Sequence, residues 1–315
     1  MKVLILGNGA REHALAWSFS KSKRNSGLFC MPGNAGTADI AVNIDGDYRD
    51  GPSVVAAART HGVNLVVIGP EAALAAGVAD AVRAAGIAAF GPGASAARLE
   101  SSKVFARDFS IRAGIPSART LRFTRLADFV AWLDAGRPGP AAGAALGGGN
   151  GSRLKAMFGF GSPAPGGALN GPPLTGRIVL KKSGLAAGKG VLESGDEAEL
   201  KTFAQAVLAD DELLVEEFLA GYELSVFSLT DGTDYLTLPA CADHKKALPD
   251  NQGLNTGGMG AICPVPSADR AMMDRIDREI VAPTFRQMAR EGLGFRGVVF
   301  FGVMVCQDGP KLLEY

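Results

Sequence analysis

The sequence has no net charge, few aromatic side chains and no long hydrophobic run. Its 32 basic and 32 acidic residues cancel, so no global positive field exists that would attract a nucleic acid or an anionic membrane. No apolar run approaches the roughly 20 residues of a membrane span, and the N-terminal run over 3–6 is shorter than a signal-peptide core. We therefore expect a cytoplasmic protein that acts on small molecules and binds neither nucleic acid nor membrane.

Cysteine and histidine are also scarce. The cysteines are Cys30, Cys241, Cys263 and Cys306, without a C-x-x-C pair, and disulfide frameworks belong to short secreted chains. We interpret them as buried, reduced thiols. The three histidines are as scattered, so we expect no transition-metal cluster.

Glycine, in contrast, is abundant, and it separates short apolar runs from helical patterns. In the first hundred residues we expect strands over 2–6, 64–68 and 87–90, and helices over 11–20, 71–85 and 95–113. Short buried strands that alternate with helices predict βαβ units and a parallel sheet. The length of 315 residues suggests about two domains.

The later part of the chain mixes strands and helices less regularly. We expect a strand over 178–181, a helix over 197–208, an antiparallel meander over 213–239, a helix over 268–290 and a hairpin over 297–315. The acidic pair 216–217 follows an apolar strand, which by itself is typical of a solvated edge.

Residues 136–176 differ in kind from the rest. They hold thirteen glycines, six prolines, no acidic residue and no hydrophobic period of 2 or 3.6. Such a segment buries too little apolar surface to offset the entropy lost on ordering. We expect a disordered insertion; a glycine-rich phosphate loop would need a strand before it and a helix after it.

The loop Gly7-Asn8-Gly9 follows the first strand and opens the first helix, a place where backbone N–H groups favour a phosphate. A dinucleotide fingerprint would have a third glycine where Glu12 stands and an acidic residue at the end of a second strand, so NAD is disfavoured. A monophosphate held by this turn and by Arg11 fits better. A tight structural turn is the alternative.

The stretch 184–190 looks like a P-loop but fails its spacing. Three residues rather than four separate Gly184 from the Gly188-Lys189 pair, and no Ser or Thr follows. We interpret it as a flap whose amides and Lys189 cover a triphosphate. Lys181, at the end of the preceding strand, would be costly to bury alone, so we expect an anionic partner.

A second glycine-rich stretch has Gly257, Gly258 and Gly260 within four residues, bordered by Asn255 and Thr256. Close approach of the backbone to a small ligand explains this density better than a generic turn.

These loops belong to a series of strings in chain order. The strings are LGNGAREHALAW (6–17), PGNAGT (32–37), VVIGPEAAL (66–74), FGP (90–92), SKVFARDF (102–109), SGLAAGKGV (183–191), VEEFLAGYELS (215–225), DHKKA (243–247), GLNTGGMGA (253–261) and KLLEY (311–315). Together they resemble the phosphoribosylamine–glycine ligases, ATP-grasp enzymes of purine biosynthesis, over nearly the whole chain apart from 136–176.

The resemblance implies a mixed α/β and α+β fold. A Rossmann-like N-terminal domain would span 1–101 and an ATP-grasp domain 102–315, with a lid subdomain over about 121–214. The family continues after its L-E-Y/F motif with an Asn, an Arg-Phe-Gly-Asp-Pro-Glu run and a C-terminal domain. Because this sequence ends at Tyr315, we expect a C-terminally truncated member.

The resemblance also implies an ATP site. Lys103 and Lys181 would neutralise phosphate charge, the backbone of 216–219 would meet the adenine, and Glu223 the ribose. The expected ATP-binding set is Lys103, Lys181, Gly184, Gly188, Lys189, Gly190, Glu216, Glu217, Phe218, Leu219 and Glu223; Lys181, Lys189 and Asn255 are expected to be catalytic. Glu314 would bind Mg2+ or Mn2+. Two departures from the family are Ser183, where many relatives have Asp, and a shorter linker before Glu216.

Two further groups would bind the other substrates. The first comprises Gly7, Asn8, Gly9, Arg11, Gly69, Pro70 and Glu71, for the phosphoribosyl group; the second comprises Asp243, Lys245, Asn255, Thr256, Gly257, Gly258, Met259 and Gly260.

The implied reaction joins glycine to 5-phosphoribosylamine at the expense of ATP, through glycyl phosphate. The products are glycinamide ribonucleotide, ADP and phosphate. Fusion to, or association with, other purine-pathway enzymes is a further implication. Two alternatives stay open: another ATP-grasp carboxylate–amine ligase, which the spelling LNTGGMGA disfavours, and a nucleotide-binding fragment inactive through truncation.

Overall fold

The computed structural model describes residues 1–139, 172–185, 190–249, 252–256 and 258–315, with the backbone alone for 252–255. The chain divides into two compact units. The first comprises Met1–Ser101, Leu229–Leu236 and Glu291–Val298, and the second comprises the other described residues. No helix in these described ranges is long and apolar enough to cross a membrane.

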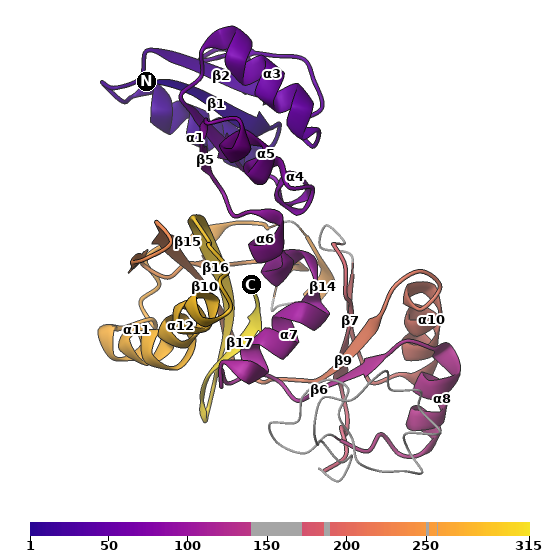
Figure 1. The fold of residues 1–315 in the computed structure, drawn as a ribbon. Helices are drawn as coiled ribbons and strands as arrows, with labels where there is room; N and C mark the ends of the chain where they lie inside the picture. The colour runs from indigo at the N-terminus through magenta and orange to yellow at the C-terminus, as the bar shows by residue number, and fades with distance from the viewer. Residues whose placement is uncertain (140–171, 186–189, 250–251, 257) are drawn as a thin grey trace. The chain divides into compact units, whose positions relative to one another are not determined.

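The first unit contains a five-stranded parallel sheet in the order β3-β2-β1-β4-β5 (Figure 1). The strands are β1 (Lys2–Gly7), β2 (Gly27–Pro32), β3 (Val42–Asn43), β4 (Leu65–Ile68) and β5 (Ala88–Phe90). The helices are α1 (Ala10–Ser20), α2 (Ala35–Ala38), α3 (Gly51–His61), α4 (Glu71–Ala75), α5 (Val78–Ala84) and α6 (Ala94–Ser101). The predicted parallel sheet of a Rossmann-like domain is confirmed, although β2 and β3 were not expected.

The central strand β1 is buried on both faces. Leu4 and Leu6 pack into a core with α3 and α5, whereas Val3 and Ile5 pack into a second core with α1. All four side chains are fully buried, which explains why the strand is a continuous apolar run without alternation.

Two helices that were each predicted as one are broken. The helix predicted over 71–85 is divided between α4 and α5 at Gly77, whose φ is +78°. The helix predicted over 95–113 is divided at Ser102, which is extended and whose hydroxyl accepts a hydrogen bond from the Phe105 amide. Ser102 therefore caps a new helix, α7 (Lys103–Arg112), because its side chain offers the backbone a partner outside the helix.

The second unit contains a four-stranded antiparallel sheet in the order β6-β9-β7-β8, which we call the lid sheet. Its strands are β6 (Thr120–Phe123), β7 (Ile178–Lys182), β8 (Val191–Ser194) and β9 (Leu213–Glu217). Two helices, α8 (Leu126–Asp134) and α10 (Glu197–Val207), cover one face of it (Figure 1). Trp132, Phe129 and Leu200 are fully buried in the core between them.

A second sheet, which we call the body sheet, has the order β11-β10-β16-β17. Its strands are β10 (Tyr222–Thr230), β11 (Tyr235–Thr237), β16 (Gly297–Cys306) and β17 (Gly309–Glu314). The helical stretch of α11 (Arg270–Ile276), the π-helical turn η1 (Asp277–Val281) and α12 (Ala282–Arg290) follows the predicted helix over 268–290. Two small ladders pair β12 (Ala242–Asp243) with β15 (Ala261–Ile262), and β13 (Lys246–Leu248) with β14 (Gln252–Asn255).

The predicted hairpin at the end of the chain is confirmed, because β16 and β17 pair antiparallel. The predicted meander over 213–239 is wrong for its first strand, although its other two strands, β10 and β11, are neighbours. β9 pairs with β6 and β7 in the lid sheet, whereas β10 and β11 belong to the body sheet. A turn at Gly221 therefore leads from one sheet to the other rather than to a neighbouring strand.

The predicted insertion over 136–176 is too wide at both ends, and its middle, 140–171, lies outside the described residues. Leu174 is buried in the lid core, and its amide donates to the Arg137 carbonyl at 2.9 Å. A side chain on Gly139 would touch the Pro172 carbonyl, so the two ends of the undescribed segment lie in contact. Burial of the apolar Leu174 side chain thus favours an ordered chain at 172–176, where the composition alone suggests disorder.

Candidate functional site

The first group of predicted residues lies at the carboxyl ends of β1 and β4. The chain leaves β1 toward β2 on one side, whereas β4 pairs on the other, so the strand order reverses between them. Open α/β sheets bind ligands at such a switch point. The loop after β1 starts at Gly7, and the loop after β4 contains Gly69, Pro70 and Glu71. The fold therefore brings both predicted segments to one edge of the sheet.

The two loops pack so tightly that Gly7 has no room for a side chain. Its φ is +116°, and a Cβ there would lie 2.7 Å from the Pro70 ring and 2.8 Å from Glu12. Glu12 is 4% exposed, and its carboxylate accepts a hydrogen bond from the Gly9 amide at 2.7 Å. The Gly9 amide therefore already has a hydrogen-bond partner. Glu12, which is not among the predicted site residues, caps the N-terminus of α1 through this bond from its position three residues after Gly9.

Arg11 connects the same two loops. Its guanidinium donates to the Gly69 carbonyl at 2.5 Å and to the Glu71 carboxylate at 2.8 Å. The Arg11 side chain is more than half exposed, so a phosphate that reaches it competes with Glu71 rather than filling an empty cationic site.

A third loop at this edge is 32–37, which belongs to the strings of the family resemblance but has no predicted role. The side-chain amide of Asn34 donates to the carbonyls of Asn8 and Gly9 at 3.0 and 3.3 Å. The Oδ1 atom of the same side chain accepts a hydrogen bond from the Thr37 amide and so caps α2. Asn34 thereby fixes the backbone of the Gly7–Gly9 loop. The PGNAGT string at 32–37 was the signal that could have identified it.

In the second unit, Lys181 has the anionic partner that its burial predicts, but this partner is Glu216 within a buried ion network of the chain itself. Its ammonium lies 2.8 Å from one carboxylate oxygen of Glu216, and Arg107 lies 2.5 Å from the other. All three side chains are less than a tenth exposed. Burial alone would raise the pKa of Glu216, but the charges of Lys181 and Arg107 hold it at about 2. Glu216 is therefore ionised and is not part of a solvated edge.

This network reaches from the lid sheet to the body sheet. Lys181 on β7 also donates to the carbonyl of Leu313 on β17, at 3.2 Å. Arg107 comes from α7, one helical turn after Lys103, a spacing that places both cations on one face of the helix. That spacing within SKVFARDF was the available signal for Arg107.

Lys103 and Glu314 add a further cation and a carboxylate. Burial lowers the pKa of Lys103, and the Lys181 charge lowers it further, against the opposing effect of Glu314. Lys103 donates its backbone amide to the Ser183 carbonyl at 2.9 Å, so it also touches the start of the glycine-rich loop. Three predicted residues, Lys103, Lys181 and Glu314, are thus brought together.

Glu223 and Lys245, predicted for ribose and substrate, form an ion pair of 2.7 Å in which each side chain is about one-third exposed. Burial acts to lower the pKa of Lys245, but the hydrogen bond with Glu223 and the charges of Glu314 and Asp243 raise it above its usual value. The charge of Glu314 therefore acts on Lys245 as well as on Lys103.

The two ends of the predicted flap are anchored. The Gly184 amide donates to the Asp211 carboxylate at 2.9 Å, and the Lys182 amide donates to the Gly190 carbonyl at 2.8 Å. Asp211, which we had not predicted, sits just before β9. The predicted residues Gly188 and Lys189 lie outside the described residues.

The predicted adenine segment passes from the lid sheet into a connecting strand. Glu216 and Glu217 are still paired with β6 and β7, so their backbone groups already have ladder partners. Phe218 and Leu219 follow the end of β9 and are the members of the segment outside the ladder. Arg177 lies over the Phe218 ring at 4.7 Å from its centre.

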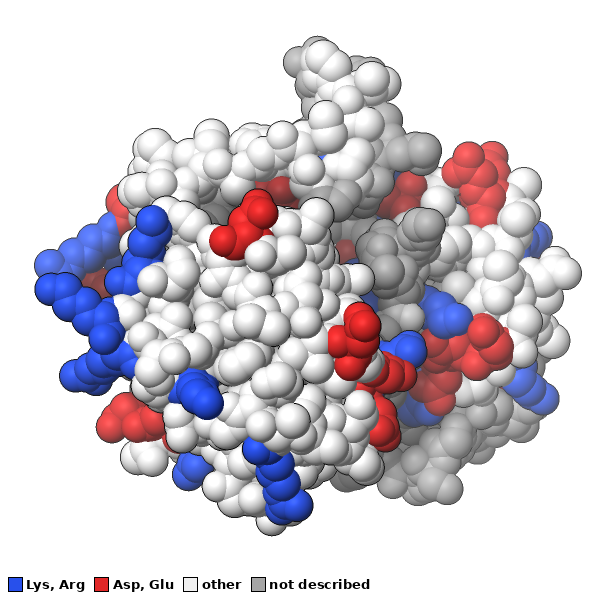
Figure 2. Space-filling model, turned by 90° about the horizontal axis from the view of Figure 1, so that it is seen from above, with Lys and Arg blue, Asp and Glu red and all other residues white. Residues whose placement is uncertain are grey.

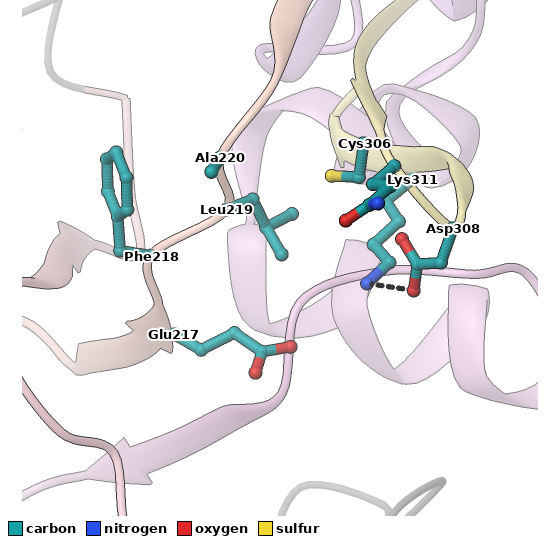
Figure 3. Close-up of a pocket in the computed structure, with 8 residues that line it drawn as sticks. Glu217, Phe218, Leu219, Ala220, Cys306, Asp308 and Lys311 are labelled. Atoms are coloured by element: carbon teal, nitrogen blue, oxygen red, sulfur yellow. Dashed lines mark ion pairs between the residues drawn. The ribbon is translucent and has the colours of Figure 1, made fainter.

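A pocket of about 400 Å3 adjoins this segment (Figure 3). It is lined by Glu217, Phe218, Leu219, Ala220, Cys306, Gln307, Asp308 and Lys311. In Figure 3 the side chains of Glu217 and Leu219 point toward the hairpin that carries Cys306 and Lys311, whereas the Phe218 ring points away. Lys311 is paired with Asp308 at 2.9 Å.

The second glycine-rich stretch folds back on the residues that precede it. Both the amide and the hydroxyl of Thr256 donate to the Lys245 carbonyl, at 2.7 and 2.8 Å. Gly258 has a φ of +119°, and a Cβ there would lie 2.9 Å from the Asp243 carboxylate. Met259 is 64% exposed. Of the remaining predicted residues, Asn255 is described by its backbone in β14, Gly260 pairs with His244, and Gly257 lies outside the described residues.

Glu314 is a single carboxylate rather than part of a protein-built metal cage. Within the described ranges, no group of three His, Cys, Asp or Glu side chains could hold a metal ion. Mg2+ is commonly bound through one or two carboxylates together with substrate phosphates, so one carboxylate beside Lys103 and Lys181 fits a metal that arrives with a nucleotide.

Figure 2 shows both acidic and basic side chains on the face that it presents, with basic side chains gathered along its left edge.

Comparison with known proteins agrees with this arrangement. The family profile of the phosphoribosylglycinamide synthetase N domain matches residues 1–100, and that of the phosphoribosylglycinamide synthetase ATP-grasp (A) domain matches residues 172–315. The phosphoribosylamine–glycine ligases of Streptomyces coelicolor and Rhizobium meliloti are 41% and 40% identical to the whole of this chain, which covers 66% and 67% of them. The chain thus spans about two thirds of the length of these relatives.

Solved structures show the same likeness. The crystal structure of phosphoribosylamine–glycine ligase from Thermotoga maritima matches the whole chain with a TM-score of 0.73 at 27% identity, and the chain covers 68% of it. The N5-carboxyaminoimidazole ribonucleotide synthetase of Thermus thermophilus, at 16% identity, a TM-score of 0.62 and coverage of 99% of this chain and 70% of that one, shares the fold. The chain therefore belongs to the phosphoribosylamine–glycine ligase family, a family of ATP-grasp ligases, as its sequence predicted.

Proposed function

We propose that this chain catalyses the ATP-dependent ligation of glycine to 5-phosphoribosylamine, with glycinamide ribonucleotide, ADP and phosphate as products. The names of the relatives support the reaction, and the ATP-grasp profile supports the use of ATP. The chain spans about two thirds of the length of those relatives, so their activity and substrates are a proposal for this chain.

The observation that carries the proposal is the convergence of Lys103, Lys181 and Glu314 between the lid sheet and the body sheet. Lys181 bridges to the backbone of Leu313, and Lys103 is close enough to Glu314 and Lys181 for their charges to shift its pKa. Two cations and a carboxylate whose charges act on one another suit a nucleotide triphosphate with a divalent cation.

The chemistry explains why such a site is needed. A carboxylate is a poor acyl donor, because expulsion of oxide is prohibitive near neutral pH. Transfer of the γ-phosphoryl group of ATP to glycine gives glycyl phosphate, which has a good leaving group. The amine of 5-phosphoribosylamine then attacks the acyl carbon and releases phosphate. The protein contributes positioning and charge neutralisation, and lid closure excludes water.

We propose roles for the predicted ATP residues on this basis. Lys103 and Lys181 bind phosphate oxygens, and the anchored loop from Gly184 to Gly190, with Gly188 and Lys189, covers them. Phe218 and Leu219 present backbone that lies outside the ladder to the adenine, beside Glu216 and Glu217, whose backbone is paired in the sheet. Glu223 accepts a hydrogen bond from the ribose. When bound through Glu314, Mg2+ or Mn2+ would neutralise phosphate charge.

The other substrates are assigned to the two remaining clusters. Gly7, Asn8, Gly9, Arg11, Gly69, Pro70 and Glu71 bind the phosphoribosyl group at the switch point of the first unit. Asp243, Lys245, Asn255, Thr256, Gly257, Gly258, Met259 and Gly260 surround the glycine and the reacting amine, with Asn255, Lys181 and Lys189 as the catalytic set.

We further propose that the domain boundary lies between residues 101 and 102, with the lid over about 121–214. The division of the compact units at Ser101, and the end of the N-domain profile at residue 100, support this boundary. A cytoplasmic location and an association with other purine-pathway enzymes stay predictions.

Release of ADP that depends on both glycine and 5-phosphoribosylamine tests the proposal. Lys181→Ala removes one charge-assisted contact, so we expect about 10- to 100-fold weaker ATP binding. Lys182→Ala is the matched control. It is the next lysine on β7, and its ammonium is paired with Asp210 on the opposite side, at 3.1 Å. We expect Lys182→Ala to leave ATP affinity within a few-fold of wild type.

The outcomes separate the alternatives. ADP release that ignores glycine but responds to another carboxylate would indicate a different ATP-grasp carboxylate–amine ligase. Saturable ATP binding without ADP release would indicate a nucleotide-binding protein. Equal losses in Lys181→Ala and Lys182→Ala would contradict the assignment of Lys181.

A further inference from the structure

Two cysteines lie opposite each other at the base of the substrate loop. β12 and β15 pair antiparallel, with Ala242 opposite Ile262 and Asp243 opposite Ala261. One more step in this register places Cys241 opposite Cys263. The expectation that all cysteines are buried holds for Cys30 alone, because Cys263 is exposed and Cys241 and Cys306 are partly exposed.

The hydrogen bonds of Cys241 favour a close approach of its side chain to that of Cys263, as a cross-strand disulfide requires. The amide and carbonyl of Cys241 are both bonded to Ser225, at 2.8 and 2.7 Å, on the side away from Cys263. We infer that Cys241 and Cys263 are a non-hydrogen-bonded pair, a kind of pair in which the Cα atoms are typically about 4.5 Å apart and the side chains are close. This lies at the short end of the Cα separation of about 4.4–6.8 Å found in disulfides.

The sulfur atoms point to the same place. The Cys241 and Cys263 thiols both lie beside the carbonyl of Pro239, at 3.9 and 3.8 Å. Burial, and then the hydrogen bond with the Cys263 thiol, raise the pKa of Cys241 to about 11. The two sulfurs are thus neighbours, and Cys263 is the more accessible one.

We propose that Cys241 and Cys263 are a reversible oxidation site that a small-molecule disulfide converts into an intramolecular disulfide. The Cys263 thiolate attacks the small disulfide, breaks its S–S bond and expels one thiol. The sulfur of Cys241 then attacks the mixed disulfide at Cys263 and expels the second thiol. Both protein sulfurs are oxidised, the small disulfide is reduced, and the two thiol protons leave with the two released thiols.

The bond would close the loop that runs from β12 to β15. This segment contains Lys245, whose carbonyl holds Thr256, and Gly258, which packs against Asp243. This consequence rests on the proposed function: if the loop must adjust around glycine, oxidation lowers glycine-dependent turnover and reductant restores it.

Oxidised glutathione in excess, followed by alkylation and peptide mapping without reduction, tests the site independently of activity. We expect two of the four thiols to be lost together and a peptide that joins Cys241 to Cys263. Buried Cys30 is the internal control and should stay reduced. In Cys241→Ser the mixed disulfide should accumulate at Cys263, because the resolving sulfur is gone.

The opposite result would overturn the proposal. A stable mixed disulfide at Cys263 in the wild-type chain, or a joined peptide that involves Cys306, would show that Cys241 does not resolve it. Turnover is measured separately, before and after reductant, with Cys263→Ser as control. A joined peptide with unchanged turnover would keep the oxidation site and refute its effect on the loop. Absence of turnover in the reduced chain would instead count against the proposed function.

Discussion

Replacement of Glu216 by glutamine should cost far more stability than the same change at the next residue. Glu216 is buried between Arg107 and Lys181, with oxygen–nitrogen distances of 2.5 and 2.8 Å. Glu216→Gln leaves two buried cations without a counter-charge, and removal of one partner from a buried ion pair costs about 3–5 kcal/mol. We expect the free energy of unfolding to fall by about that amount.

The size of the loss should depend on pH in a direction that the pKa of Glu216 sets. Burial acts to raise this pKa from its ordinary 4.5, but Lys181 and Arg107 lower it to about 2 in the folded chain. A carboxylate with a lowered folded-state pKa stabilises the protein above its unfolded pKa, and this contribution is lost as the pH falls through the folded value. The difference between wild type and Glu216→Gln should be full at pH 7 and should shrink below about pH 4.5.

Urea unfolding followed by circular dichroism measures both effects. Glu217→Gln is the matched control, because Glu217 pairs with Arg119 at 2.6 Å while both side chains are 21–26% exposed. A pair that water can reach should contribute about 1 kcal/mol. Equal losses for the two variants, or a loss at Glu216 that does not change between pH 7 and pH 3, would refute the reasoning.

Three further changes test other parts of the structure. Lys103→Ala and Lys181→Ala should each weaken ATP binding more than binding of the phosphoribosyl substrate; equal losses for both ligands in calorimetry would contradict the ATP assignment. Replacement of 140–171 by a short Gly-Ser linker should leave the free energy of unfolding unchanged, because the ends of this segment lie in contact, whereas Leu174→Ala should lower it by about 2–5 kcal/mol. Urea unfolding of both variants decides this, and a large loss for the linker variant would show that the segment supports the fold. Gly7→Ala should reduce both stability and phosphoribosyl binding, since φ is +116° there; unchanged binding would remove this loop from the site.

Local patterns were enough to predict the parallel sheet of the first unit and its central strand, but not β2 and β3. The apolar run of β1 is short and continuous, and it is flanked by glycine, so its burial on both faces follows from the sequence alone. The break at Ser102 was also readable, because a serine that precedes an apolar helical pattern is a common cap. It was missed because the helical periodicity on either side of it is strong.

Contacts between distant segments could not be predicted in the same way. Glu216 follows an apolar strand and on local pattern belongs to a solvated edge, but its partner Arg107 lies 109 residues earlier in the chain. The carbonyl of Leu313 that holds Lys181 lies 132 residues later. The predicted meander failed for the same reason, since β9 pairs with strands on the far side of 136–176 as well as near it. Family resemblance supplied the candidate residues, but it did not supply these pairings.

The pairings give a chain without net charge a local positive charge at the site proposed for the triphosphate. Arg107 and Lys181 share a single carboxylate, Glu216, so this buried network carries one net positive charge before any ligand arrives. Lys103 adds a second ammonium, and burial lowers the pKa of Lys103 because its charge is less well solvated than at the surface, so a bound phosphate stabilises that charge more than it would at the surface. Arg107 and Lys181 are already buried in the folded chain, so the cost of removing water from these two cations is met in folding rather than in binding. A nucleotide therefore finds local positive charge that is fixed in place, although the sum over the whole sequence is zero.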